Sequence, residues 1–121
     1  MTREEFVWGI SVAVQEGAVR SAKKDLQSPG AEPSPWRNEL ATWFNRLPEA
    51  EAEMVLRAVN LAVDVSVFGF LCVLDGVRAI ERGEDKGEIR LSYIRRDEET
   101  RLNGSGDLDL HDIFHKYMHT L

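Results

Sequence analysis

The last twelve residues of the chain, LHDIFHKYMHTL, contain all three of its histidines. His111, His115 and His119 are spaced four residues apart, which lines up their side chains along one side of a helix. Two histidines at positions i and i+4 can bind zinc, which needs four ligands, or three ligands and a water molecule. No HExxH motif is present, so further ligands would have to be carboxylates such as Asp64 or Asp75. We favour a solvated helix edge over a metal site at His111 and His115, and we expect no tight zinc binding.

Asp64 and Asp75 form a second group. On a helix they are three turns apart on one face, at about 16 Å, which is far too wide for a catalytic pair of carboxylates. Phe68 and Leu71 lie between them, so an exposed face would be an apolar patch ringed by charge, which is typical of a docking site. These four residues are the candidate partner-binding residues. A buried face would instead require a hydrogen-bond partner for Asp64, such as Arg57, and we favour this structural role for Asp64.

Other patterns that could support catalysis are better explained by structure. Cys72 is the only cysteine, and its apolar surroundings, FGFLCVLDG, indicate a buried thiol rather than a nucleophile. The glycines in LNGSGDLDLHD match no phosphate-binding motif, and Asp107 and Asp109 would repel a phosphate. The sequence has no cofactor fingerprint and no nucleophile with a paired base. We therefore expect no cofactor and favour a protein that is not an enzyme.

The length of 121 residues, with 43% hydrophobic residues, is typical of a single domain covering residues 1–121. A formal net charge of −6 argues against nucleic acids and anionic membranes as partners and favours a basic protein partner. The first residues do not resemble a signal peptide. The apolar region from Leu61 to Leu74 contains polar residues and is too short to cross a bilayer. We therefore expect a cytoplasmic protein without a membrane partner.

Thr2 and Glu5 have the spacing of a capping box, which predicts a first helix that ends near Gln27. Its apolar residues form two stripes, although a surface helix needs only one. The second stripe has the spacing of a helix pair and includes Trp8, Val12 and Val19. We expect this stripe to be buried, either against the rest of the fold or in a homodimer contact.

Three prolines and a glycine make residues 28–35 a loop, which either connects two helices or forms a lid. A second helix should begin at Pro35. We expect one of its stripes in the core: Trp36, Leu40, Trp43, Phe44 and Leu47. The third helix should cover residues 48–82 and stop at Gly83, with a kink or break near Ser66 or Gly69 because of its length. The strand-like alternation in VDVSVFGF leaves two helices or a strand as alternatives there.

The alternation of Ile89, Leu91 and Tyr93 predicts a strand over residues 88–95, which RDEE turns back into a short second strand, TRL. Asp107 or Asp109 should cap the last helix. Its core stripe is expected to contain Leu110, Ile113, Phe114, Tyr117, Met118 and Leu121. The predicted fold is α+β and mainly α-helical: three helices, a small β-hairpin, then a C-terminal helix.

Residues 68–116, with FGFLCVLDGVRAIERGEDKGEIRLSYI and LNGSGDLDLHDIFHK, resemble small bacterial proteins of unassigned function. The shared pattern contains no catalytic motif, so the resemblance implies no active-site residue. In size, acidity and single-domain build the whole chain also resembles bacterial immunity proteins. That resemblance implies a protein that neutralises a cognate toxin by binding it.

We therefore expect a non-enzymatic, cytosolic protein-binding domain, with toxin neutralisation as its implied role. One alternative is a small metal-binding protein or enzyme that uses the C-terminal histidine edge. A second alternative is a structural homodimer.

Overall fold

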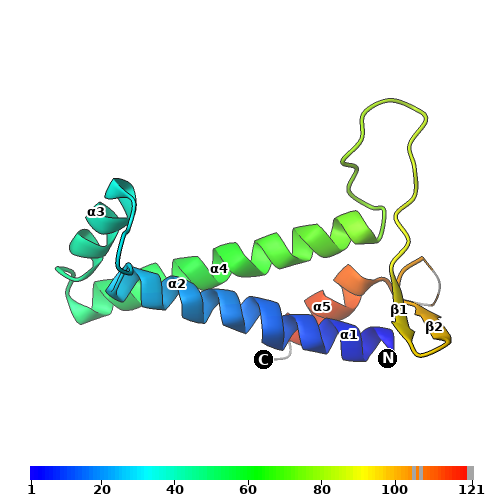
Figure 1. Ribbon diagram of the computed structural model, residues 1–121, viewed down its shortest axis with the longest axis horizontal. Coiled ribbons are helices and arrows are strands. Elements are labelled where there is room, and N and C mark those ends of the chain that lie inside the picture. Colours follow the sequence, from blue (N-terminus) through cyan, green and yellow to red (C-terminus); the bar gives the residue numbers. More distant parts are fainter. Residues whose placement is uncertain (105, 107, 120–121) are drawn as a thin grey trace.

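The computed structural model describes residues 1–104, 106 and 108–119. Its elements in chain order are α1 (Arg3–Ile10), the π-helix η1 (Ser11–Glu16), α2 (Gly17–Gln27), α3 (Pro35–Phe44), α4 (Glu49–Leu74), β1 (Ser92–Arg95), β2 (Glu98–Arg101) and α5 (Leu110–His119). The fold is α+β and mainly helical, as predicted. Figure 1 shows α1 and α2 as one rod beside α4, with α3 at one end and α5 and the hairpin at the other.

The rod begins where the sequence predicts. The Thr2 hydroxyl accepts a hydrogen bond from the backbone N–H of Glu5 at 3.1 Å, which satisfies one of the free donors at the helix start. The helix then continues to Gln27 without a break in its path, but η1 in its middle is π-helical. A π-helix has wider turns than an α-helix, so the angular positions of the side chains shift along the rod.

The chain covers a different stripe of the rod from the one predicted. The fully buried side chains near η1 are Val7, Ser11 and Gln15. Trp8 and Val12 are 55% and 41% exposed, and Val19 is half-buried. The prediction that Trp8 and Val12 are buried within the chain was therefore wrong, while their burial in a homodimer stays a prediction.

The second helix also buries a different strip from the one predicted. α3 begins at Pro35 and packs against α2. Ala41 and Phe44 are buried, whereas Trp36, Leu40 and Trp43 are exposed. The predicted core stripe was wrong for these three residues, because a helix that contacts one neighbour at the end of the molecule covers only a narrow strip.

α4 is a single uninterrupted helix of 26 residues that ends at Leu74, not at Gly83. The predicted break near Ser66 or Gly69 is absent, and the Ser66 hydroxyl donates to the Ala62 carbonyl at 2.7 Å within the helix. Gly76 stops the helix, because its φ of 79° lies in the left-handed region that glycine adopts without strain. Residues 75–91, predicted in part as helix, have no regular secondary structure.

The hairpin forms as predicted, but the bounds of both strands differ: β1 is shorter, and β2 covers Glu98–Arg101, not residues 100–102. β1 and β2 are antiparallel, with Tyr93 opposite Thr100. The strand starts at Ser92 because the preceding backbone bonds to the buried side chain of Asn103. Asn103 Oδ1 accepts from the Leu91 N–H, and Asn103 Nδ2 donates to the Ile89 carbonyl, both at 2.8 Å. Nδ2 also donates to the Leu74 carbonyl, which ties the hairpin to the end of α4.

The core lies at one end of the molecule, where α5 packs on both α1 and α4. Its buried cluster consists of Val7, Val67, Leu71, Leu110, Ile113 and Phe114. The predicted stripe of α5 is confirmed for its first three members, and Tyr117 and Met118 pack partly against the cluster. Leu121, like the proposed cap Asp107, lies outside the described residues. Leu91 also packs against this core.

Candidate functional site

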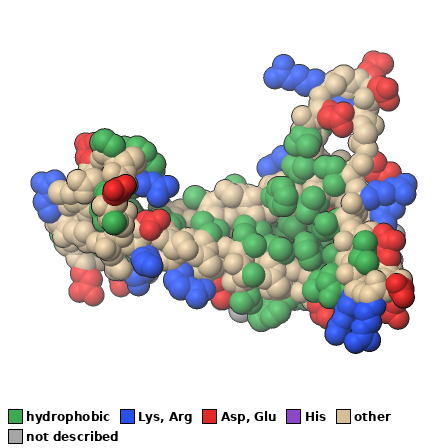
Figure 2. Space-filling model, in the orientation of Figure 1, with side chains coloured by type: hydrophobic (Ala, Val, Ile, Leu, Met, Phe, Trp, Pro, Cys, Tyr) green, Lys and Arg blue, Asp and Glu red, His purple; other side chains and the backbone are tan. Residues whose placement is uncertain are grey.

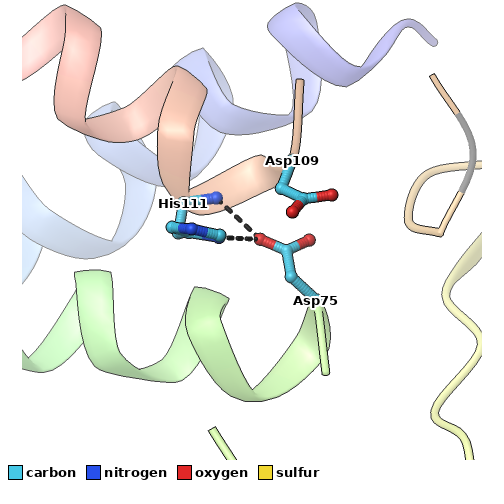
Figure 3. Close-up of side chains that lie close together, drawn as sticks. All are labelled: Asp75, Asp109 and His111. Atoms are coloured by element: carbon cyan, nitrogen blue, oxygen red, sulfur yellow. Dashed lines mark hydrogen bonds and ion pairs between the residues drawn. The ribbon is translucent and has the colours of Figure 1, made fainter. Parts of the chain in front are cut away.

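The side chain of Asp75 joins the end of α4 to the start of α5 (Figure 3). Its Oδ1 accepts a hydrogen bond from the backbone N–H of Leu110 at 3.1 Å, and its Oδ2 accepts one from the N–H of His111 at 2.8 Å. The side chain is fully enclosed, with 0% exposure. A negative charge at this position also suits the positive end of the α5 dipole. Asp75 is therefore the N-terminal cap of α5, supplied from a distant part of the chain.

His111 is held between two carboxylates. Its Nδ1 lies 2.6 Å from Asp75 Oδ2, and its Nε2 lies 3.4 Å from Asp112 Oδ1. The ring lies nearly perpendicular to that of Phe68, with ring centroids 5.7 Å apart. The imidazole is 16% exposed. These contacts fix the orientation of the ring and leave it little freedom to move toward a substrate.

The same junction contains the ligand atoms of one candidate metal group. One ligand atom each from Asp75, Asp109 and His111 lies within 4.8 Å of the other two. The sequence analysis named Asp75 as a ligand that could join His111, and the structure brings these two together. His115 is not part of this group and lies beside Phe68, with ring centroids 6.1 Å apart. The side chain of His119 lies outside the described part of the chain.

A shallow groove of about 240 Å³ lies on the surface along the line where α4 and α5 meet. It is lined by Asp64, Val65, Phe68, Phe114, His115 and Met118. The groove thus unites three residues that the sequence singled out for different reasons: Asp64, Phe68 and His115. Asp64 Oδ1 is buried there without a hydrogen-bond partner among the described residues. The expected bond from Arg57 is absent, since Arg57 Nη1 lies near Met54 Sδ at 4.0 Å.

A second cavity, of about 290 Å³, lies between the end of α4, the irregular segment 76–91 and Asn103. Its wall contains the paired charges Arg101 and Glu88, whose Nη2 and Oε1 atoms are 2.6 Å apart. The hydrogen bond from Arg101 and the nearby charge of Arg90 lower the pKa of the Glu88 carboxyl. Sequence reasoning missed this cavity, because it placed a helix where the segment actually turns away.

Cys72 has the environment that the sequence predicted. The thiol is buried, and this burial raises the pKa of Cys72 above its usual value. The nearest cation that acts on it is Arg78, which opposes the shift. A buried, protonated thiol is a poor nucleophile, so Cys72 belongs to the packing of the fold.

The candidate partner-binding residues separate into two groups. Leu71 is 1% exposed and belongs to the core, and Asp75 is enclosed at the α5 cap. Neither can be reached by a partner in this structure. Asp64 and Phe68 are half-buried and line the α4–α5 groove, where a partner can contact them.

Large apolar side chains are exposed elsewhere, on a face of α4 that sequence reasoning missed. Met54, Leu61 and Val65 are 59%, 63% and 57% exposed. The signal was available, because α4 is apolar on nearly all sides and a helix of that kind is normally covered all round. Figure 2 shows one face of the molecule, on which hydrophobic side chains gather around the C-terminal end of α4.

The length and composition of α4 also correct the argument about membranes. By length and composition alone, the helix is long and apolar enough to cross a bilayer. Most of its apolar part is not buried inside the protein. A core helix of a soluble protein can pass the same test, so this result is weak evidence for a membrane span.

Comparisons with family models, curated proteins and solved structures give no significant match to this chain.

Proposed function

We propose that this protein is a non-enzymatic protein-binding domain that docks through exposed apolar faces of its helices. The observation that carries the proposal is the exposure of large side chains on two separate helices. Trp8 and Val12 lie on the N-terminal rod, and Leu61 and Val65 lie on α4. Contiguous exposed apolar residues on a folded domain are typical of binding surfaces.

The total surface supports the same proposal. The chain exposes 9059 Å², whereas a compact monomer of its 13.7 kDa mass would expose about 6,600 Å². An elongated shape of this kind leaves apolar helix faces that the chain itself cannot cover. A partner that covers them would gain the free energy of removing apolar surface from water.

The polar groups favour binding over catalysis. Asp75 accepts hydrogen bonds from two backbone N–H groups at the start of α5 and lies 2.6 Å from the His111 ring, and the Cys72 thiol is buried. These contacts give each group a structural role in the described part of the chain. The exposed apolar side chains of the rod and of α4 have no such structural role, and a binding function would explain them.

The charge of the chain indicates the kind of partner. The net charge is −6, and acidic residues cluster at the start of α4, at the hairpin turn and at the start of α5. Such charges steer a basic partner toward the surface and favour partners of positive charge over partners of negative charge. A basic toxin, as the resemblance to immunity proteins implies, is the partner that we propose.

A capture experiment with two matched variants tests this proposal. The immobilised chain should retain a basic protein from lysate of the source cell, and the association rate should fall as salt is raised. Val12→Asp should weaken binding of that purified partner, because Val12 lies on the exposed face with Trp8. Val14→Asp is the control, since Val14 is also an exposed valine but lies on another side of the rod.

Two results would refute the proposal. The first is a partner whose binding is unchanged by Val12→Asp and by Leu61→Asp, since no apolar face would then be used. The second is retention of acidic proteins only, which would refute the electrostatic part.

A metal-binding role is the second candidate, and the grouping of Asp75, Asp109 and His111 favours it. A divalent cation there would have to compete with the hydrogen bond between His111 Nδ1 and Asp75 Oδ2. Calorimetric titration with zinc tests this role. A stoichiometric site that is lost in His111→Ala would support it over the binding domain.

A further inference from the structure

The exposed face of α4 has the residue spacing of a coiled-coil seam. Met54, Ala58, Leu61 and Val65 follow one another at intervals of four, three and four residues. This alternation keeps apolar side chains on one line along the helix, where they pack against a second helix. All four side chains are exposed. We call these four residues the α4 seam.

The same spacing continues into residues that the chain covers itself. Phe68 and Cys72 are the next two members of the series. The rings of His111 and His115 lie against Phe68, and Cys72 is buried. The covered part shows that this line of α4 packs against other groups wherever the chain supplies them. Over the α4 seam, the residues that the structure describes leave these side chains exposed.

The seam lies away from the core side of α4. At a hundred degrees per residue, its centre is about 130° from the mean direction of Val67 and Leu71, which face α1 and α5. A partner helix could therefore dock on the seam without displacing anything in the core. Ala58 at the centre of the seam is small, so the two helix backbones could approach closely.

The charges beside the seam indicate a second copy in antiparallel orientation. Arg57 and Asp64 lie on the same flank of the seam, seven residues apart. In an antiparallel pair related by a two-fold axis, residues on the same flank of the two helices meet. Arg57 of each copy would then face Asp64 of the other copy. In a parallel pair they would face the uncharged residues Ala62 and Gly69.

The present contacts of these two residues fit that arrangement. Asp64 is half-buried, and its Oδ1 atom is buried without a hydrogen-bond partner within the described residues, so a second chain would have to meet the carboxylate from its exposed side. The guanidinium of Arg57 is exposed beside Met54. A carboxylate and a guanidinium that are not paired with each other within the chain would become paired between two chains. The arrangement forms this ion pair twice, which is the usual result of two-fold symmetry.

The available area is large enough for such a contact. The exposed surface of the whole chain exceeds that of a compact monomer of equal mass by about 2,500 Å², an excess shared between the helix faces and the exposed segment 76–90. A standard interface buries about 800 Å² on each partner, a fraction of that excess. The seam also borders the α4–α5 groove, which Val65 lines together with Met118. The apolar surface therefore extends beyond the seam itself.

We propose that two copies of this chain form a homodimer through antiparallel packing of their α4 seams, with Arg57 of each copy paired to Asp64 of the other. This inference rests on the proposed function, because it takes one of the exposed apolar faces and names its occupant. It places the dimer contact on α4 and leaves the stripe with Trp8 and Val12 free for a different protein.

The mass of the full chain in solution tests the dimer. Sedimentation equilibrium should give twice the 13.7 kDa mass of one chain. Leu61→Asp combined with Val65→Asp should give a monomer with an unchanged circular dichroism spectrum, because both side chains point into solvent in the single chain. Ile94→Asp on β1 is the matched control. Ile94 is similarly exposed, at 67%, and this variant should remain dimeric.

A charge exchange tests the antiparallel pairing. Arg57→Asp should weaken the dimer roughly tenfold or more, since it places like charges opposite each other twice. Asp64→Arg should do the same. An equimolar mixture of the two variants should form a heterodimer, in which every facing pair is again of opposite charge. Mixing that restores no dimer would refute the antiparallel arrangement.

The remaining outcomes separate this inference from the proposed function. A wild-type chain that stays monomeric at high concentration overturns the dimer. If that monomer binds another protein and Leu61→Asp abolishes the binding, the protein-binding function stands without the dimer. If the monomer instead sediments with uncharged phosphatidylcholine vesicles and Leu61→Asp prevents this, the face binds lipid, and the dimer and protein docking on this face are both overturned. A dimer that the α4 variants do not weaken would show that the dimer contact does not lie on the α4 seam.

Discussion

Asp75 and His111 are 36 positions apart in the sequence, yet one carboxylate oxygen of Asp75 bonds both the backbone N–H and the ring Nδ1 of His111. The contact fixes the end of one helix to the start of another. It makes the position of α5, and therefore the packing of Ile113 and Phe114, depend on a residue that follows α4. The first prediction concerns this dependence.

Asp75→Ala should destabilise the fold by about 2–3 kcal/mol, because two backbone donors of α5 and the imidazole lose their enclosed acceptor. Urea unfolding followed by circular dichroism measures the loss. Asp75→Asn keeps one carbonyl oxygen and should cost less. Asp85→Ala, in the irregular segment, is the control and should leave the midpoint unchanged. Equal stability of the Asp75→Ala protein and the wild type would contradict the capping role.

Asn103→Ala should release the segment 75–91 from the body of the protein. The Asn103 side chain bonds the backbone of Leu74, Ile89 and Leu91 and is 2% exposed, so its removal leaves three backbone groups without partners. We expect faster tryptic cleavage after Arg82 and Lys86 than in the wild type. Asn103→Asp should be compared with Asn103→Ala. It keeps the acceptor for the Leu91 N–H but loses the hydrogen bonds to the Leu74 and Ile89 carbonyls. Unchanged cleavage in both variants would show that the segment is held by other contacts.

Glu88 should remain ionised at a lower pH than an ordinary glutamate. The hydrogen bond from Arg101, followed by the charge of Arg90, lowers the pKa of Glu88. Because the folded-state pKa is below the unfolded one, the pairing adds stability above the unfolded pKa and loses it as pH falls through the folded pKa. A carbon-detected NMR titration of the Glu88 carboxyl measures the pKa. Arg101→Gln should raise it toward the usual value.

Cys72 should be almost unreactive toward a disulfide reagent at neutral pH while the protein is folded. Its burial raises the pKa of the thiol, so the thiolate is scarce and shielded. The folded-state pKa is above the unfolded one, so the stability linked to the neutral thiol is fully present below the unfolded pKa and is lost as pH rises from that value through the folded pKa. In Cys72→Ala, the free energy of unfolding should no longer show this fall at alkaline pH. Rapid labelling of the native protein would contradict the buried assignment.

Helix starts could be predicted from the sequence, because the chemistry that fixes them is local. Thr2 caps α1 through Glu5, and Pro35 begins α3. The end of α4 could not be predicted from apolar periodicity, which continues past Leu74. The helix stops there because Gly76 takes a left-handed conformation and Asp75 bonds to a helix that comes much later in the chain.

In the candidate site, too, the sequence predicts what depends on local residues and not what depends on contacts between distant parts of the chain. The sequence named Asp75 as a group that could meet His111, but its role as a cap depends on the packing of α5 against α4. Apolar periodicity identified the stripes with Trp8 and Trp36, but it could not tell which stripes the chain covers. That depends on the number of neighbours around each helix, and α3 contacts α2 at one end of the molecule.

The position of the core at one end implies a gradient of local unfolding along α4. Amides near Val67 and Leu71 should exchange with solvent slowly, because they open only when the whole α1–α4–α5 cluster opens. Amides near Met54, and those of α3, should exchange by partial opening that costs much less free energy. The first half of α4 packs on α2 within the chain, and its other face is free for a second copy to cover. Raising the concentration of the protein should therefore slow exchange in the first half of α4 more than near Val67 and Leu71.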